Sequence, residues 1–528
     1  MIPTARKKKL LRFAFPIAVG MLLLLLSQIG LGFAAGNDNL PAREPRRLSS
    51  ELLQQFVNEF EQQRHFYHVP GAAVAIVHNN EVILARGFGV RKLGESTPIT
   101  AETLFSVGSL SKSMTAMMVG SLVDDGYFNW STPINQLNPQ FRLANDAATY
   151  KITLRDTFSH TSGLPDLEIV TAHSGLLPRE IFQYLHGVTP DAPAGSSYLY
   201  SNTVFTVGSY SAVVAAEREV DENLGHEYRE LVEERLFNPM GMKNSGLSSN
   251  FIRASANHAT PYISRINGDI AQTGLTPIQA QFSEIGSLVP AGGIRSSAMD
   301  MSRYLLTLLN RGVSPDGHQV ISNTNLQELF KPHIKLPSGP LFDSVSYGLG
   351  WMNTSYQGVP VLTHSGQIGG FSSTIALVPQ ANLGIVVLSN IDNAGLPFNQ
   401  SIQYRLVEML YDLQPRITTF TRKLYLEQAK QLSEFYQLLK PINTTVVGPF
   451  IGSYQLWGDP YQLQIRDKRL WLLRGGADLT ELLRGPDNRY YGVSGSHIGL
   501  FIDLITGRDG HLAIRLNGKD KLYKSVTL

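Results

Sequence analysis

The 528-residue sequence predicts a large α+β domain, built on an antiparallel sheet flanked by helices, and a small β-barrel-like domain at the C-terminus. Three observations predict this architecture. A helix and a strand hairpin begin the large domain, apolar β-branched runs return far downstream, and short alternating strands fill the C-terminal tail. The length also favours two folded parts, because a single core rarely grows past about 250 to 300 residues.

The first elements follow from the periodicity of residues 49–89. We expect a helix from Ser49, because four apolar side chains recur on one helical face: Leu53, Phe56, Val57 and Phe60. Residues 72–77 and 82–89 are apolar runs that flank Asn79-Asn80. This pattern predicts two strands of a hairpin joined by an Asn-Asn turn.

The next elements are a central helix and a group of late strands. Residues 110–124 form a helical pattern that is apolar on several sides, which predicts a helix buried in the centre of the domain. Three apolar runs separated by glycine-rich or polar turns are expected to complete the sheet: residues 361–363, 374–378 and 384–388.

These elements set the expected domain boundaries. The α+β domain covers residues 49–412, and its long middle is filled by helices and loops. Residues 413–445 are expected to form a helical connector. Residues 446–528 form the small β-domain, because segments such as 461–465 and 512–516 alternate between apolar and polar side chains.

The N-terminal residues 1–36 are typical of an export signal. Basic residues precede an apolar run from Phe13 to Ala35, and a polar stretch follows it. The run is close to the roughly 20 residues that span a bilayer, so a cleaved signal peptide and an uncleaved membrane anchor both remain open. Residues 37–48 read as a solvated linker. We therefore expect an exported protein, periplasmic or extracellular, whose only membrane contact is this segment.

Composition excludes several classes of function. The formal charge of +2 arises from 45 basic and 43 acidic residues, so nucleic acid is not an expected partner. The absence of cysteine removes disulfides, thiolate metal sites and a thiol nucleophile. The sequence also lacks the metalloprotease His-Glu-x-x-His, the phosphate-binding P-loop and the Gly-x-Ser-x-Gly elbow. We expect neither a metal nor a cofactor.

The first chemical motif is Ser109-Leu110-Ser111-Lys112. Positions i and i+3 share one face of a helix, so the Ser109 hydroxyl and the Lys112 ammonium can meet inside the protein. Burial lowers the pKa of a lysine from its free value of about 10.4, which would allow Lys112 to act as a base toward Ser109. The alternative is a helix-capping serine followed by a surface lysine. An exposed lysine fits poorly in a helix that is apolar on most sides.

The second motif is Tyr200-Ser201-Asn202, expected on a turn before an apolar helix. A phenol beside a lysine can share the proton transfers, and the Asn202 amide can hold a substrate carbonyl. The alternative reading is a core tyrosine and a helix-capping asparagine.

The third motif is His364-Ser365-Gly366, followed by Gln367, which we expect at the end of a strand lining a cleft. A second His-Ser-Gly at residues 173–175 lacks flanking strands and is interpreted as a loop. Without the other two motifs, His364 could equally be a structural histidine.

In this order, Ser-x-x-Lys, Tyr-x-Asn and His-x-Gly resemble the three boxes of the serine β-lactamase and penicillin-binding protein superfamily. The set is most similar to the branch of class C β-lactamases and D,D-peptidases, and the resemblance covers most of residues 49–412. It implies a β-lactamase/transpeptidase-like fold. Further landmarks of the resemblance are Phe158-Ser159-His160-Thr161-Ser162-Gly163-Leu164-Pro165, Pro239-Met240-Gly241-Met242, Pro290-Ala291-Gly292-Gly293-Ile294 and Tyr347-Gly348-Leu349-Gly350-Trp351.

The resemblance implies a role for each box. Ser109 would be the nucleophile that forms an acyl-enzyme, with Lys112 and Tyr200 as the proton-transfer pair. Asn202, His364, Gly366 and Gln367 would bind substrate, and the backbone N–H groups of Ser109 and Gln367 would form the oxyanion hole. Segment 158–165 is interpreted as structural.

The third box departs from the β-lactamases of this branch, which carry lysine where this chain carries His364. Neutral histidine holds a substrate carboxylate less firmly than lysine, although it can still donate a hydrogen bond. We therefore expect a serine hydrolase that cleaves a small ester, a D-amino-acid amide or a D-Ala-D-Ala-type peptide, with peptidoglycan as a candidate partner. A class C-like β-lactamase and a non-catalytic ligand-binding module remain alternatives, and the oligomeric state stays open.

Overall fold

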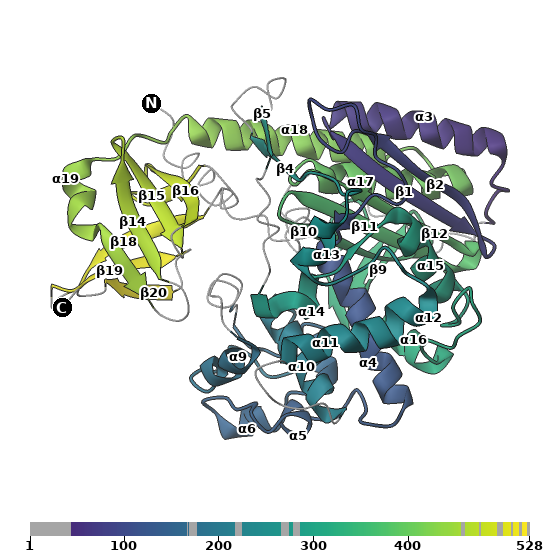
Figure 1. The fold of residues 1–528 in the computed structure, drawn as a ribbon, viewed down its shortest axis with the longest axis horizontal. Coiled ribbons are helices and arrows are strands. Elements are labelled where there is room, and N and C mark those ends of the chain that lie inside the picture. Colours follow the sequence, from purple (N-terminus) through teal and green to yellow (C-terminus); the bar gives the residue numbers. More distant parts are fainter. Residues whose placement is uncertain are drawn as a thin grey trace.

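The computed structural model describes residues 44–165, 167, 177–216, 224–265, 274–277, 286–455, 460–474, 477–493, 500–507, 510–516 and 520–524. It confirms the predicted fold class: a large antiparallel sheet is flanked by helices, and a closed barrel follows at the C-terminus (Figure 1). The predicted export signal at residues 1–36 and most of the linker at residues 37–48 lie outside the described residues.

The main sheet has eight strands in the order β2-β1-β12-β11-β10-β9-β8-β7. Neighbouring strands pair antiparallel throughout, and β10 places His364 opposite Ile375 on β11. The first and last parts of the domain therefore meet within one sheet, where β1 pairs with β12, next to the edge strand β2. The strands are β1 (Gly71–His78), β2 (Glu81–Gly89), β7 (Ile334–Leu336), β8 (Ser344–Tyr347), β9 (Met352–Tyr356), β10 (Val359–Ile368), β11 (Phe371–Val378) and β12 (Leu383–Ser389).

Helices cover both faces of this sheet, so the domain has two apolar cores (Figure 1). Alternating side chains of β1 enter opposite cores, because successive residues of a strand point to opposite faces. Val74 packs with α3 (Ser50–Phe66), α17 (Gly395–Tyr411) and α18 (Ile417–Tyr436). Its neighbours Ala73 and Ala75 pack on the other face, with α4 (Ser111–Asp124), α10 (Asn202–Ala215) and α15 (Ala298–Leu309).

Shorter elements connect these layers. The remaining helices are α5 (Ile134–Leu137), α6 (Asp146–Thr149), α7 (Leu154–Phe158), α9 (Pro178–Leu185), α11 (Leu224–Val232), α12 (Asn238–Met240), α13 (Ser249–Ala254), α14 (Val289–Gly292), α16 (Asn323–Phe330) and α19 (Thr444–Val447). Short 3₁₀ helices occur at η1 (Gly108–Leu110), η4 (Gly286–Leu288), η5 (Pro379–Ala381) and η6 (Gly448–Phe450), and η2 (Glu233–Phe237) is a π-helical segment. Two small sheets pair β3 (Phe105–Ser106) with β6 (Arg295–Ser296), and β4 (Tyr262–Arg265) with β5 (Gly274–Pro277).

Helix α18 leads from the sheet domain to the C-terminal barrel (Figure 1). Its Phe435 packs edge-on against Tyr491 of the barrel, with 4.9 Å between the ring centroids. The barrel closes in sequence order and encloses its own apolar core. Its strands are β13 (Gly452–Gln455), β14 (Tyr461–Arg466), β15 (Arg469–Arg474), β16 (Ala477–Arg484), β17 (Tyr490–Gly492), β18 (Phe501–Thr506), β19 (Leu512–Leu516) and β20 (Asp520–Lys524).

Local sequence signals explain where the first elements begin and turn. The Ser49 hydroxyl accepts a hydrogen bond from the Leu52 amide and caps α3. Asn79 and Asn80 both have positive φ, at 51° and 64°, which a two-residue hairpin turn requires and asparagine tolerates. Within the part of the chain that the structure describes, no helix combines the length and the apolar character needed to cross a membrane.

The third box lies in the last part of strand β10, as expected, and this strand extends beyond the apolar run at residues 361–363 to Ile368. The cause is that β11 pairs with the whole segment, including Gly366 and Gln367, which lie opposite Ser373 and Ser372. The third box is therefore part of the sheet and not of a loop.

Candidate active site

Ser109 lies in η1, immediately before the buried helix α4. The chain enters this turn through Gly108, whose φ of 54° is in the left-handed region that favours glycine. A Cβ atom at Gly108 would also lie 2.8 Å from the Gln367 nitrogen of β10. The tight approach of η1 to β10 thus requires glycine at position 108, and it places Ser109 beside the third box.

Lys112 projects from the first turn of α4 toward Ser109, as the i and i+3 spacing predicts. Its Nζ lies 3.1 Å from Ser109 Oγ, and its side chain is completely buried. The ammonium also donates to Asn202 Oδ1 at 2.5 Å and to the Ala291 carbonyl at 2.7 Å. Burial favours the neutral amine, whereas these two oxygens favour the ammonium. Lys112 is therefore held by acceptors from three separate segments and cannot be a surface lysine.

Tyr200 reaches the same serine from the second box. Its hydroxyl donates to Ser109 Oγ at 2.8 Å, and the Lys112 Nζ lies 4.8 Å from its ring centroid. Helix α10 begins directly afterwards, where the Ser201 hydroxyl caps it by accepting from the Val204 amide. Asn202 is the first residue of that helix. The structure thus brings Ser109, Lys112, Tyr200 and Asn202 into one hydrogen-bonded cluster.

The third box faces Ser109 across a contact that only glycine permits. A Cβ atom at Gly366 would lie 2.1 Å from the Val107 carbonyl oxygen and 2.9 Å from the Ser109 nitrogen. The neighbouring Ser373 hydroxyl donates to the Val107 carbonyl at 2.6 Å and ties β11 to the same turn. The backbone nitrogens of Ser109 and Gln367 consequently lie beside the same turn, where both could donate to an oxyanion.

His364 lies on β10 with both ring nitrogens engaged by the protein. Nδ1 is 2.7 Å from the Ser365 carbonyl and must donate to it, so Nε2 accepts from the Tyr347 hydroxyl at 2.9 Å. Burial, with the nearby Lys112 charge as a second cause, lowers the pKa of His364 to about 3. In this arrangement the one N–H group of the neutral His364 ring is bonded to Ser365, so the predicted hydrogen bond to a substrate carboxylate would require this contact to break.

Two further residues belong to this site and were not predicted as functional. Tyr347 binds His364, and His160 packs against the rings of Tyr200 and Tyr347 with centroid separations of 4.4 Å and 5.2 Å. Both residues lie in segments that carry the family resemblance. In the sequence, the available signal was an aromatic ring or an imidazole next to small residues. The sequence does not show which of the three boxes each of these side chains would contact.

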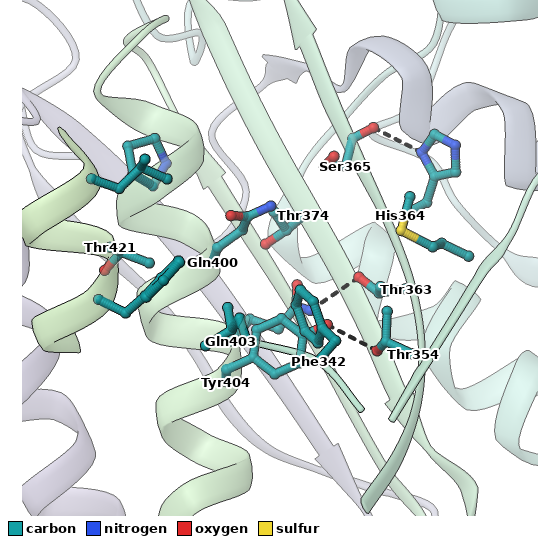
Figure 2. A pocket seen from close by; sticks show the side chains of 15 residues that line it. Phe342, Thr354, Thr363, His364, Ser365, Thr374, Gln400, Gln403, Tyr404 and Thr421 are labelled. Carbon is teal, nitrogen blue, oxygen red and sulfur yellow. Dashed lines mark hydrogen bonds between the residues drawn. The ribbon is translucent and has the colours of Figure 1, made fainter. Parts of the chain in front are cut away.

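A separate cavity of about 40 Å³ lies behind β10, between the sheet and helices α17 and α18 (Figure 2). In this view Gln403 and Tyr404 reach from α17 toward Thr363 and Thr354, to which they are hydrogen bonded at 3.0 Å each. The cavity borders His364, but its lining includes neither Ser109 nor the residues that contact Ser109. It is therefore distinct from the candidate active site.

The described residues include no group of three histidine, cysteine, aspartate or glutamate side chains arranged to hold a metal ion. The chemical groups that do converge are a serine, a lysine, a tyrosine and a neutral histidine. This arrangement is suited to nucleophilic attack by an activated hydroxyl.

Comparison with known proteins agrees with this geometry. The Beta-lactamase family model matches residues 56–406. The chain belongs to the beta-lactamase family. It is similar to "Unguisins hydrolase ungD'" of Aspergillus campestris, with 28% identity over 78% of this chain and 77% of that protein. It is also similar to "Penicillin-binding protein 4" of Amycolatopsis lactamdurans, with 25% identity over 63% of this chain and 83% of that protein.

Among solved structures, the octameric penicillin-binding protein homologue from Pyrococcus abyssi has a similar fold, with a TM-score of 0.59 and 18% identity. The match covers 89% of this chain and all of the homologue. The family and the names of these relatives support a serine hydrolase of the β-lactamase and penicillin-binding protein type.

Proposed function

We propose that this protein hydrolyses its substrate through an acyl-enzyme on Ser109. The observation that carries the proposal is the position of Ser109 Oγ, which lies 3.1 Å from Lys112 Nζ and 2.8 Å from the Tyr200 hydroxyl. Both distances are within reach of direct proton transfer. A serine that only capped a helix would not need two titratable side chains at its hydroxyl. Capping alone therefore does not explain this arrangement.

The reaction follows from these contacts. The Lys112 and Tyr200 pair takes the Ser109 proton as Oγ attacks the substrate carbonyl carbon. The developing oxyanion accepts hydrogen bonds from the Ser109 and Gln367 amides. The tetrahedral intermediate then collapses: the bond between the carbonyl carbon and the leaving group breaks, the pair gives its proton to the leaving group, and the acyl group stays on Ser109. Water later attacks this ester, gives a proton to the same pair, and releases the acid as the proton returns to Ser109 Oγ.

We further propose that the preferred substrate carries no carboxylate next to the scissile bond, as in a small ester or a D-amino-acid amide. His364 supports this preference, because it is neutral at physiological pH and its N–H group is bonded to Ser365. A carboxylate at this place would find neither a positive charge nor an available N–H group on the His364 ring. This argument disfavours an efficient β-lactamase.

A D-Ala-D-Ala-type peptide is the second candidate substrate. The observation in its favour is the similarity to a protein named penicillin-binding protein. This reading makes peptidoglycan a partner and places the protein outside the cytoplasmic membrane, in line with the basic and apolar character of residues 1–36. A non-catalytic binding module is disfavoured by the converging side chains at Ser109.

Matched substrates separate these proposals. We would compare the hydrolysis of a neutral chromogenic ester with that of the same ester bearing a carboxylate beside the scissile carbonyl, and with a D-Ala-D-Ala peptide. We expect the neutral ester to have the largest kcat/KM. Equal or faster turnover of either carboxylate would contradict the proposed specificity, and no turnover of any ester by the folded protein would contradict the proposed hydrolase.

A further inference from the structure

His160 holds the main chain on both sides of Tyr200. The Leu199 amide donates to the His160 carbonyl at 2.9 Å, and the Ser201 amide donates to His160 Nδ1 at 3.2 Å. The imidazole also packs on the Tyr200 ring, with 4.4 Å between centroids and 38° between planes. Three separate contacts from one residue therefore surround Tyr200 and limit where its hydroxyl can lie.

The His160 backbone adopts a conformation that few side chains tolerate. Its φ is 58°, in the left-handed region, where histidine is less unfavourable than most residues. The next residue, Thr161, holds this turn in place. Its backbone amide donates to the Asp156 carbonyl at 2.9 Å, and its carbonyl accepts from the Gly195 amide at 2.7 Å. A left-handed residue persists only where the surrounding structure maintains it, and such residues gather at functional sites.

The hydrogen bond from Ser201 also fixes the protonation state of His160. Because Nδ1 accepts an N–H group, the single proton of the neutral ring is on Nε2. Nε2 is buried and has no hydrogen-bond partner within the described structure. Burial, followed by the nearby Lys112 charge, holds the pKa of His160 well below its ordinary value. The acceptor at Nδ1 is therefore preserved at any pH where the enzyme would work.

We propose that His160 is a positioning residue that holds the Tyr200 hydroxyl on Ser109, through its Nδ1 acceptor and its ring face. This role rests on the proposed function, in which Tyr200 shares the proton transfers. Segment 158–165, which sequence reasoning assigned to structure alone, then forms part of the active-site support. His160 touches no reacting atom, so its effect must pass through Tyr200.

Two substitutions separate the acceptor from the ring. In His160→Asn, the amide oxygen can still accept from the Ser201 amide, and asparagine tolerates the left-handed conformation. In His160→Phe, the ring remains but the acceptor is lost. The control is His186→Phe, the same change at an exposed histidine that lies outside this segment. Thermal unfolding of each variant checks that the fold is kept.

The measurement is the single-turnover rate of Ser109 labelling by an activated phosphonate, together with kcat and KM for a neutral ester. We expect His160→Phe to lower the labelling rate and kcat by about 100-fold with little change in KM, since a small displacement of a catalytic group costs this much. His160→Asn should recover most of the rate, and His186→Phe should match the wild type. Should His160→Phe not fold, His160→Gly tolerates the backbone conformation and should show the same loss.

A double-mutant cycle tests whether the effect passes through Tyr200. If it does, adding His160→Phe to Tyr200→Phe should lower the rate by less than about threefold, because neighbouring groups that act together are not additive. Additive losses, or an Asn variant as slow as the Phe variant, would overturn the positioning role. A wild-type protein that is never labelled would instead overturn the proposed function itself, so the two failures are distinguishable.

Discussion

In both the sheet domain and the C-terminal barrel, successive residues of a strand point to opposite faces, but the buried side chains serve different purposes in the two regions. In the sheet domain, β10 carries His364 and Gly366 to a turn that presents Ser109, and the buried groups there are polar and hydrogen bonded. In the barrel, the inward residues of β15 and β16, such as Leu472 and Leu482, form an apolar core. Among the described residues, a lysine and a tyrosine converge on Ser109, whereas the core of the barrel is made of apolar side chains and tyrosines.

This difference determines which substitutions each region can accept. A barrel core tolerates exchange of one apolar side chain for another of similar volume. The site around Ser109 does not, because each polar group there is the partner of another and glycine is required at two positions. We therefore expect the same kind of substitution to have opposite consequences in the two regions.

The largest effect is expected from Lys112→Met, which removes the cation but keeps the volume. We expect the rate of Ser109 labelling by a phosphonate to fall about 1,000-fold, the scale of a lost general base. The comparison variant Lys243→Met lies in an exposed position and should behave as the wild type. A Lys112 variant that retains more than a tenth of the rate would contradict the assigned base.

The next largest effect is expected from Gly366→Ala. The added methyl would overlap the Val107 carbonyl, so β10 must shift away from Ser109. Loss of one oxyanion donor costs about 100- to 1,000-fold in kcat. Ester kinetics test this expectation, with Gly448→Ala in the C-terminal domain as the control because a Cβ there meets no other atom and its φ of −51° suits alanine. Equal kcat values for both variants would argue against an oxyanion hole at Gln367.

A smaller effect on activity is expected from Leu472→Ala in the barrel. This fully buried leucine should cost the barrel about 2 to 5 kcal/mol in free energy of unfolding, as buried large-to-small substitutions do. Below the unfolding transition, the labelling rate at Ser109 should stay within about twofold of the wild type, because the barrel adds no group to the described site. A large loss of labelling at full folding would show that the barrel contributes to the chemistry.

The smallest effect concerns stability against acid. The pKa of His364 is about 3 in the folded protein and about 6.5 when unfolded, so only the unfolded state binds a proton between these values. Stability is therefore complete above pH 6.5 and falls as the pH drops, by up to about 1.4 kcal/mol for each pH unit. Thermal unfolding between pH 7.5 and 4.5 should show a weaker pH dependence in His364→Gln. An unchanged slope would contradict a buried neutral imidazole.

Local signals in the sequence explain what could be predicted. The Ser49 cap, the Asn79-Asn80 turn and the Ser109 to Lys112 spacing each act over a few residues, so periodicity and side-chain chemistry were sufficient. The pairing of His160 with Tyr200 joins residues far apart in the chain, and only the tertiary fold brings them together. The orientation of His364 depended in the same way on Tyr347 and on the full length of β10.

The most direct test of the central claim is intact-mass analysis of the purified protein after brief exposure to an activated ester, with acid quenching and peptide mapping. The account predicts one added acyl group, located on Ser109, which decays in the wild type as turnover proceeds and is absent from Ser109→Ala. An adduct of equal yield in Ser109→Ala, or turnover of the ester by that variant at the wild-type rate, would contradict it.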